Sequence, residues 1–378
     1  MSRRDRADVA VVGAGVIGLG AAWRAARRGL EVIVLDPAPG MGASWAAAGM
    51  LAPLSEATPR EAALFPLASD SLGRWPAFAA DLEADAGAEV GLRHEGTLAI
   101  ALDDDDRRHL ADVLDRSRNF GLSSEWLAGR ACRRLEPALH PSVRGGFEIP
   151  TDLQVDNRAV VAALVGVVEA RASLRRETVV EFRPGGNGRA HRLLTASGEV
   201  VEADQVVLAT GAAASPIAGA PDACRPPVRP VRGDIARLKG DPDEPVLSRV
   251  VRAYVEGRFV YLVPRRNGEV VVGATSEEGG WRTASRAGAV HDLLHDAIAI
   301  VPALSELELV EVIGRLRPAT PDNAPVIGQT ALEGVLLATG HYRHGFLLCP
   351  VTADAVVAAL LGEPGPSSVT PFTPARFS

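Results

Sequence analysis

The chain has 378 residues, a length that corresponds to about two or three domain-sized units. Because 47% of its residues are hydrophobic, it can form a large core and does not have the composition of a disordered protein. Its 40 basic and 47 acidic residues are spread throughout and give a net charge of −7, which argues against nucleic acid as the main partner. Three cysteines without a C-x-x-C pair indicate neither a disulfide framework nor a zinc site, so we expect no metal and a reducing, cytoplasmic location.

The N-terminal pattern predicts a strand, a glycine turn, a helix and a second strand. The strand covers residues 8–12, the turn 13–18, the alanine-rich helix 19–28 and the second strand 31–35. The first apolar run is too short for a signal-peptide core, and no apolar run reaches membrane-spanning length, so we expect no membrane partner.

Further elements follow along the chain. An Asn-Gly pair at 267–268 predicts a hairpin turn, and a proline-containing tail after Gly362 is expected to be extended. Helices are expected over 69–86, 104–119, 157–171, capped by Asn157, and 352–361, and strands over 94–102, 200–208, 233–239, 259–264 and 269–275.

The glycine turn has the spacing G-x-G-x-x-G. Gly13 permits the tight turn, Gly15 lets the backbone approach a pyrophosphate, and Gly18 allows the helix to pack closely on the strand. Asp36 ends the second strand, where its carboxylate can accept hydrogen bonds from ribose hydroxyls. These features favour a dinucleotide over a ligand-free turn; FAD and NAD both fit them, and the acid disfavours the 2′-phosphate of NADP.

Two further stretches suit contact with a flat cofactor. Residues 42–51 are mostly small, and Met50 could pack over a ring edge. Residues 206–211 form a strand that ends in Ala-Thr-Gly. Taken alone, the first is better explained as an ordinary loop or helix start, and the second as any buried parallel strand.

A third group of residues suits recognition of an acid. The planar guanidinium of Arg317 matches a carboxylate bidentately, and Tyr261 and Arg343 could assist it. A glycine-flanked turn over 341–346 could present backbone N–H groups to a flavin edge. Most arginines lie on the surface and most such turns are solvated, so these residues support a site only as a set.

Six segments in this order resemble the glycine oxidases of the D-amino-acid oxidase family of FAD-dependent oxidoreductases. The resemblance covers nearly the whole chain, and the set of segments is more specific for the family than for the substrate. The segments are the glycine fingerprint and residues 44–51, 261–264, 272–275, 314–318 and 340–345.

The resemblance implies an α/β fold with a Rossmann-like FAD-binding domain and a second, mostly antiparallel β-sheet substrate domain. The FAD-binding domain would comprise 1–78, 146–225 and 311–378, and the substrate domain 79–145 and 226–310.

The resemblance also implies which residues bind FAD. The turn from His341 to Leu347 would wrap the isoalloxazine. Cofactor-binding residues would then be Gly13, Gly15, Ile17, Gly18, Asp36, Pro37, Ala43, Ser44, Ala47, Ala48, Gly49, a backbone contact near Val180, and His341, Tyr342, Arg343, His344, Gly345, Phe346 and Leu347.

On the substrate side, the resemblance makes Arg317 the carboxylate anchor, assisted by Tyr261, with Arg343 approaching the substrate and Met50 near the pocket. Ser276 stands where related glycine oxidases often carry methionine. The monomeric sarcosine oxidases attach FAD through a cysteine near the segment of Arg317, where this chain has none, so FAD is expected to be noncovalent.

The activity implied by the resemblance is oxidative deamination of glycine, and of small amines such as sarcosine or D-amino acids. Hydride transfer from Cα to flavin N5 would yield glyoxylate, ammonia and, with dioxygen, hydrogen peroxide, in support of thiamine (thiazole) biosynthesis. Relatives also suggest a homo-oligomer, a tetramer. The alternatives are an FAD-dependent D-amino-acid or sarcosine oxidase or dehydrogenase, an NAD-dependent dehydrogenase, and a non-catalytic flavin-binding protein.

Overall fold

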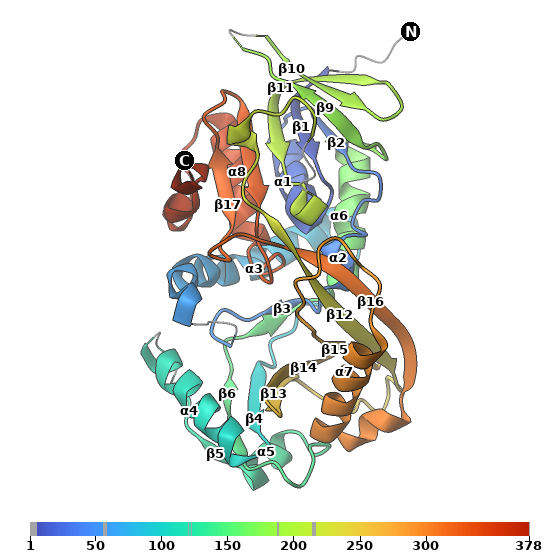
Figure 1. Ribbon diagram of the computed structural model, residues 1–378, viewed down its shortest axis with the longest axis vertical. Helices are drawn as coiled ribbons and strands as arrows, with labels where there is room; N and C mark the ends of the chain where they lie inside the picture. The colour runs from blue at the N-terminus through green and yellow to red at the C-terminus, as the bar shows by residue number, and fades with distance from the viewer. Residues whose placement is uncertain are drawn as a thin grey trace.

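The computed structural model describes residues 6–55, 59–119, 121, 123–186, 189–213 and 217–377. Within these residues the strands form two eight-stranded sheets and a small pair, β3 (Met50–Leu51) with β7 (Leu153–Gln154). The first sheet occupies the upper half of Figure 1 and the second sheet the lower half. Both sheets and the helices on them match the expected α/β class.

The first sheet has a parallel centre. β1 (Arg6–Val12) lies between β2 (Val32–Leu35) and β11 (Val200–Leu208) and runs parallel to both. The carboxyl ends of these strands therefore meet at one edge, which is the usual ligand-binding edge of an open α/β sheet. The sheet is completed by β8 (Ser173–Arg175) and β18 (Val335–Thr339), both parallel, and by β17 (Val326–Gln329), β9 (Val179–Arg183) and β10 (His191–Thr195), which are antiparallel to their neighbours.

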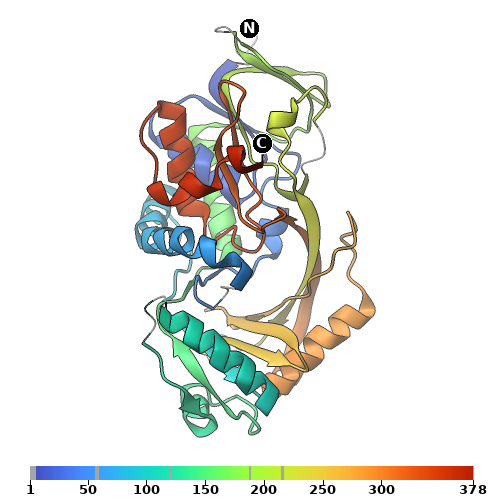
Figure 2. The same cartoon turned by 60° about the vertical axis from the view of Figure 1, so that its left-hand side comes forward.

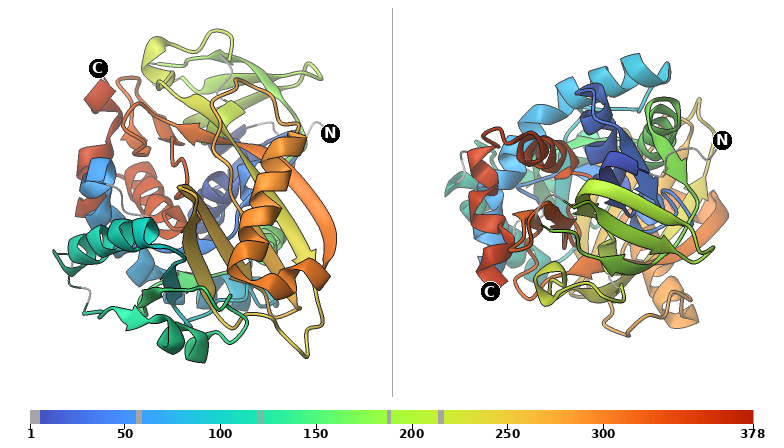
Figure 3. Two further views of the ribbon diagram at one scale, coloured as in Figure 1. Left: turned by 60° about the horizontal axis from the view of Figure 1, so that its bottom comes forward. Right: turned by 90° about the horizontal axis from the view of Figure 1, so that it is seen from above.

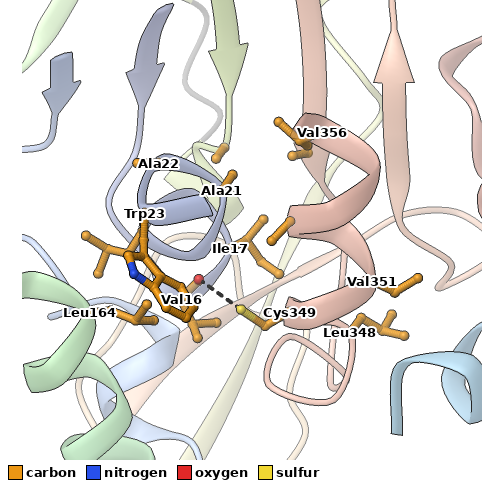
Figure 4. Close-up of a cluster of buried hydrophobic side chains, with 14 of the residues drawn as sticks. Val16, Ile17, Ala21, Ala22, Trp23, Leu164, Leu348, Cys349, Val351 and Val356 are labelled. Atoms are coloured by element: carbon orange, nitrogen blue, oxygen red, sulfur yellow. Dashed lines mark hydrogen bonds between the residues drawn. The ribbon is translucent and has the colours of Figure 1, made fainter. Parts of the chain in front are cut away.

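Four helices pack together on one face of this sheet: α1 (Val16–Arg27), α3 (Phe65–Ala86), α6 (Asn157–Arg171) and α8 (Cys349–Leu361). Figure 4 shows α8 against α1, where the Cys349 thiol lies 3.3 Å from the carbonyl oxygen of Val16. A Cβ on Gly20 would lie 2.8 Å from this sulfur, so the glycine sets how closely the two helices approach.

The second sheet is antiparallel except where β13 (Val250–Val255) runs beside β4 (Thr97–Ala101). Helix α7 (Ala287–Ile300) crosses one face of this sheet, as Figure 3 shows. Helix α4 (Asp104–Asn119) packs beside β4 and β6 (Gly145–Ile149), as Figure 2 shows. The order of the strands is β16 (Glu308–Ala319), β12 (Arg229–Lys239), β15 (Glu269–Gly273), β14 (Arg258–Pro264), β13, β4, β6 (Gly145–Ile149) and β5 (Leu127–Ala128).

Short helices complete the described chain. They are α2 (Ala43–Ala46), α5 (Gly129–Leu135) and the 3₁₀ turns Pro59–Leu64, Gly211–Ala213, Asp222–Cys224, Pro302–Glu306, Ser367–Phe372 and Pro374–Phe377. The last two correct the expectation of an extended tail, because prolines fit the first turn of such helices as well as they fit extended chain. No described helix is both long and apolar enough to span a bilayer.

The helix over 157–171 is present, but its cap differs from the expected one. Asp156 is the N-cap, and its carboxylate accepts from the N–H groups of Arg158 and Ala159 at 2.9 and 3.2 Å. Asn157 is already helical and buried. Helices α3 and α8 also begin earlier than expected, because Pro66 and Pro350 lie in their first turns, where proline is tolerated.

The division into domains remains a proposal. The expected boundary at 78 would fall inside α3, and those at 146 and 311 would fall inside β6 and β16, two strands of the second sheet.

The capping contact can be tested directly. Asp156→Ala removes the acceptor for two N–H groups, so we expect the free energy of unfolding to fall by about 1 kcal/mol in denaturant titration. Asp112→Ala, at an exposed position on α4, is the control and is expected to change little. Equal stability of the two variants would contradict the assignment of the cap.

Candidate cofactor and substrate site

A cavity of about 1170 Å³ opens where the carboxyl ends of the first sheet face the second sheet. Its walls include the glycine turn and Asp36 at one end, and Tyr261 and Arg317 at the other. Segments far apart in the sequence are therefore brought to one continuous space, which is large enough for a dinucleotide with a small substrate.

The glycine turn leaves no room for side chains. Gly13 has φ +100°, and a Cβ on it would lie 2.4 Å from the carbonyl oxygen of Ala209 on the neighbouring segment. A Cβ on Gly18 would lie 1.9 Å from the carbonyl oxygen of Gly13. The backbone of β1, α1 and the end of β11 thus meet at van der Waals limits, and the N-terminus of α1 opens onto the cavity, a favourable place for a pyrophosphate.

Asp36 organises the same end of the cavity. One carboxylate oxygen accepts from the N–H of Ala14 at 2.7 Å, and the other accepts from the N–H of Ala38 at 2.7 Å. A carboxylate has about four lone-pair sites, so these bonds leave acceptor capacity for ribose hydroxyls. The acid both fixes the turn and lines the space where a ribose would lie.

The small-residue loop lies against α1 and α6. Ser44 Oγ accepts from the N–H of Val16 at 3.0 Å, which satisfies one of the first N–H groups of α1. Asn157 Nδ2 donates to the carbonyl oxygens of Ser44 and Trp45, both at 3.0 Å. Gly49 has φ +69°, and a Cβ there would lie 2.2 Å from the carbonyl oxygen of Val155.

A buried arginine supports this loop from below. Arg265 donates to the carbonyl oxygen of Ala48 at 2.5 Å and to that of Val155 at 2.9 Å. Burial lowers the pKa of Arg265 to about 10, which leaves it charged at neutral pH. Arg265 lies at the turn between β14 and β15, so a residue of the second sheet holds the small-residue loop beside the first sheet.

The turn before α8 is tied to both sheets. Tyr342 has φ +49°, a left-handed conformation that is costly for a residue with a side chain, and its N–H donates to the carbonyl oxygen of Pro318 at 2.9 Å. His341 Nε2 pairs with Thr352 Oγ1 at 3.0 Å. Burial, with the nearby His344, lowers the pKa of His341 to about 3, so the imidazole is neutral at physiological pH.

Two glycines make room for the expected substrate residues. A Cβ on Gly233 would lie 2.2 Å from the guanidinium nitrogens of Arg317, and a Cβ on Gly273 would lie 2.2 Å from the ring of Tyr261. Arg317 donates to the carbonyl oxygen of Thr275 at 3.0 Å. The arginine and the tyrosine therefore lie across neighbouring strands β12 and β15 on the face that looks into the cavity.

The remaining substrate-side residues differ in position. Met50 is partly buried in the wall, whereas Ser276 is exposed at the rim. Arg343 lines the cavity, but its guanidinium donates to Glu61 at 2.6 Å, and Glu61 also accepts from Asn323 at 3.2 Å. The expected approach of Arg343 to a substrate is thus accompanied by an ion pair with a nearly buried acid.

Most of the predicted cofactor residues line the cavity, and four do not. Gly18 acts through packing, as described above. His344 and Leu347 are buried in the turn and in the core behind the cavity wall. Val180 lies apart on β9, 41% exposed, where its carbonyl oxygen accepts from the N–H of Ala218 at 3.1 Å.

Several residues of the site carry no local signal in the sequence. Gly233 and Gly273 look like ordinary strand glycines, although a glycine inside a strand is a known sign of close approach. Glu61 and Arg343 are 282 positions apart, so only the fold pairs them. Arg252 and Phe259 also line the cavity, with the guanidinium 4.6 Å from the ring centroid.

Residues 8–359 match the family model described as FAD dependent oxidoreductase. This chain belongs to that family. A glycine oxidase from Geobacillus kaustophilus is 32% identical to it over 98% of this chain and 97% of the relative. The crystal structure of glycine oxidase from the same organism has a TM-score of 0.89 and covers 97% of this chain and 98% of its own.

Two further relatives carry ThiO in their names. A putative thiamine biosynthesis oxidoreductase ThiO from Rhizobium etli is 36% identical over 94% of this chain and 97% of its own length. The bifunctional protein ThiO/ThiG of Trichormus variabilis is 31% identical over 98% of this chain but only 55% of its own length. This chain therefore spans about half the length of the bifunctional relatives that it matches.

The residues of the cavity fit FAD, the cofactor of the family. The cradle at Gly13 and Gly49 has no space for a Cβ, the N-terminus of α1 opens onto it, and Asp36 lines the cavity where its carboxylate could bind a ribose. Among the described residues no group of three His, Cys, Asp or Glu could hold a metal ion.

The glycine cradle yields a test with a matched control. Gly13→Ala places a methyl group against the carbonyl oxygen of Ala209, so we expect at least about a tenfold loss of FAD affinity, roughly 1.4 kcal/mol, in reconstitution titrations followed by flavin absorbance. Gly29→Ala has a similar φ of +86° but no atom within 4 Å, so it should lower stability yet keep FAD. Equal FAD affinity of both variants would refute the cradle.

His341 makes stability depend on pH. Its folded pKa, about 3, lies below the ordinary value of 6.5, so the unfolded chain binds the proton first and the free energy of unfolding falls as pH drops from 6.5 towards 3. Between pH 6.5 and pH 3, we expect the free energy of unfolding to fall less in His341→Gln than in the wild type, by at least about 1 kcal/mol. His191 shifts in the same direction and is common to both proteins. Parallel pH profiles from denaturant titrations would contradict this role.

Proposed function

We propose that this protein oxidises glycine, and small amines such as sarcosine or D-amino acids, with FAD. The reaction takes glycine, water and dioxygen to glyoxylate, ammonia and hydrogen peroxide. The observation that carries the proposal is the placement of Arg317 and Tyr261 on one wall of the cavity whose other end is the glycine cradle. The names of the relatives support glycine as the substrate.

Arg317 would bind the substrate carboxylate. Its planar guanidinium offers two parallel N–H groups to the two oxygens, and its bond to the carbonyl oxygen of Thr275 fixes the plane of the fork. Tyr261 is 8% exposed and lies beside Phe259, with ring centroids 6.2 Å apart, so its ring is held in place. A substrate gripped in this way has few orientations left.

The chain itself would supply position rather than acid–base chemistry. FAD, when bound, supplies the electron-accepting ring. The protein would hold the amino acid so that its Cα faces that ring, and orientation of this kind can contribute several kcal/mol towards the barrier. The apolar side chains of Ala46, Ala48 and Ile235, which line the cavity, would keep water away from the reacting carbon.

The wider setting is also proposed. Dioxygen as acceptor and release of hydrogen peroxide are inferred from the oxidase relatives, and a role in making the thiazole of thiamine from the relatives named ThiO. A cytoplasmic location is supported by three buried cysteines that form no disulfide. A homo-oligomer of four subunits, implied by the family resemblance, completes the proposal.

A second candidate is an FAD-dependent D-amino-acid or sarcosine oxidase or dehydrogenase. The exposed, small Ser276 at the rim favours it, because it leaves space for a larger substituent than glycine carries. Anaerobic mixing of the holoenzyme with a panel of amines, followed by flavin bleaching, ranks the substrates. Flavin reduction without peroxide on re-aeration would indicate a dehydrogenase, and a flavin that no amine bleaches would indicate a non-catalytic protein.

The anchor is tested by Arg317→Ala. We expect kcat/KM for glycine to fall on the order of a hundredfold or more, because the carboxylate loses its charged partner, while bound FAD is retained. Arg192→Ala, on the exposed face of β10 and paired with Glu202, is the control for loss of an arginine. A nearly unchanged kcat/KM in Arg317→Ala would rule out this assignment.

A further inference from the structure

One wall of the substrate end is a loop that leaves the second sheet after β15 and leads into α7. We call residues 275–286, between β15 and α7, the wall segment. It contributes Thr275, Ser276, Glu277, Trp281, Thr283 and Arg286 to the lining of the cavity. Trp281 is 56% exposed, so the outer part of the segment faces solvent. Something must hold this segment in register with Arg317, which lies beside its first residue.

A buried carboxylate joins the two ends of the wall segment. Asp234 of β12 is 0% exposed. It accepts from Thr275 Oγ1 at 2.9 Å and from Ser285 Oγ at 2.7 Å, and its N–H donates back to Thr275 Oγ1 at 2.8 Å. Thr275 and Ser285 are the first and nearly the last residues of the segment, so a single side chain closes its neck.

Arg232 completes this closure and balances the charge. It is 4% exposed and lies on the same face of β12 as Asp234, two residues away. Its Nη2 is 3.3 Å from Asp234 and 2.8 Å from Glu277, and its Nη1 donates to the carbonyl oxygen of Ala284. The pair therefore holds the wall segment at four places without leaving a buried charge unbalanced.

The same strand reaches the substrate anchor from its other face. Gly233 lies under Arg317, whereas Asp234 points away from it, because successive residues of a strand face opposite sides. Thr275 connects the two faces: its hydroxyl bonds to Asp234, and its carbonyl oxygen accepts from Arg317 Nη1 at 3.0 Å. Gly314 of β16 leaves the space for this arrangement, since a Cβ there would lie 2.4 Å from the carbonyl oxygen of Thr283.

We propose that Asp234 is a positioning residue for the carboxylate anchor, acting through Thr275 on Arg317. The proposal rests on the proposed function, in which Arg317 binds the acid group of the substrate. With the hydroxyl of Thr275 fixed, its carbonyl oxygen is aimed at Arg317 and holds one edge of the guanidinium, leaving the other edge for the substrate. When Asp234 cannot accept these hydrogen bonds, the two ends of the wall segment are no longer held together. The guanidinium of Arg317 then loses its fixed plane.

The variants Asp234→Asn and Thr275→Val test this chain of contacts from both sides. Asparagine keeps the shape of Asp234 but loses the charge that balances Arg232 and one acceptor site. Valine keeps the shape of Thr275 but removes the hydroxyl, while Asp234 and Arg232 stay paired, so it tests the proposal even where Asp234→Asn does not fold. Thr275→Ser retains the hydroxyl and should behave like the wild type.

The readouts are KM and kcat for glycine and the Kd of acetate, a carboxylate without an amine, from its perturbation of the flavin absorbance of the holoenzyme. We expect KM and the Kd of acetate to rise about tenfold to a hundredfold in Asp234→Asn and Thr275→Val, a magnitude typical of a small misplacement of a binding group, with a smaller change in kcat. For Thr275→Ser, we expect KM and the Kd of acetate to equal those of the wild type.

The control for general loss of stability is Glu136→Gln. Glu136 is a buried carboxylate elsewhere on the second sheet, 1% exposed, that accepts from the N–H groups of Ser248 and Arg249. We expect it to lower the melting temperature without moving the Kd of acetate.

Three outcomes are distinguishable. Acetate affinity and KM within twofold of the wild type in the folded Thr275→Val protein would overturn the positioning role. If the wild-type protein does not turn over glycine, but Asp234→Asn and Thr275→Val both bind acetate more weakly than the wild type, the proposed function is wrong and the positioning role is supported. Wild-type holoenzyme that binds no acetate at all would overturn both.

Discussion

The carbonyl oxygen of Ala209 lies so close to Gly13 that no side chain fits between β1 and the segment after β11. This contact sets the depth of the turn at which α1 begins, and hence where the N–H groups of its first turn open onto the cavity. Asp36, the loop of Ser44 and the turn of His341 are all placed around it. The second sheet is then held to this centre by Arg265, which reaches back to the carbonyl oxygen of Ala48.

Strand β12 shows how one strand serves two purposes. On the face towards the cavity, Gly233 has no side chain, which leaves room for the guanidinium of Arg317 to lie over the strand. Its opposite face carries Arg232 and Asp234, which hold the wall segment. The alternation of strand residues makes this division possible within three consecutive positions. A single-residue slip of β12 would exchange the two faces and destroy both functions at once.

Sequence reasoning reached the features that are local. The glycine spacing, the Asn-Gly hairpin at 267–268 and the long helices over 104–119 and 157–171 all depend on residues close in the chain, and the structure has them. The family resemblance placed Tyr261 and Arg317 together, and they line one cavity.

The features that sequence reasoning missed are of two kinds. Some depend on contacts between residues far apart in the chain, and others on which of two equally suitable neighbouring residues takes a role. Asp156 and Asn157 are both good caps, and only the buried bonds of Asn157 to Ser44 and Arg237 show why the aspartate takes that role. The pairing of Glu61 with Arg343 follows from how the turn before α8 meets the 3₁₀ turn before α3, which no spacing reveals.

The depth at which the thiols lie has a chemical consequence. Cys132, Cys224 and Cys349 are all buried, and burial raises the pKa of each, that of Cys132 to about 11. The thiolate, not the thiol, is the nucleophile that reacts with peroxide. If turnover releases hydrogen peroxide, as proposed, the cysteines are shielded from it: their thiols stay protonated and buried, and inactivation by sulfenic acid formation would require the fold to open first.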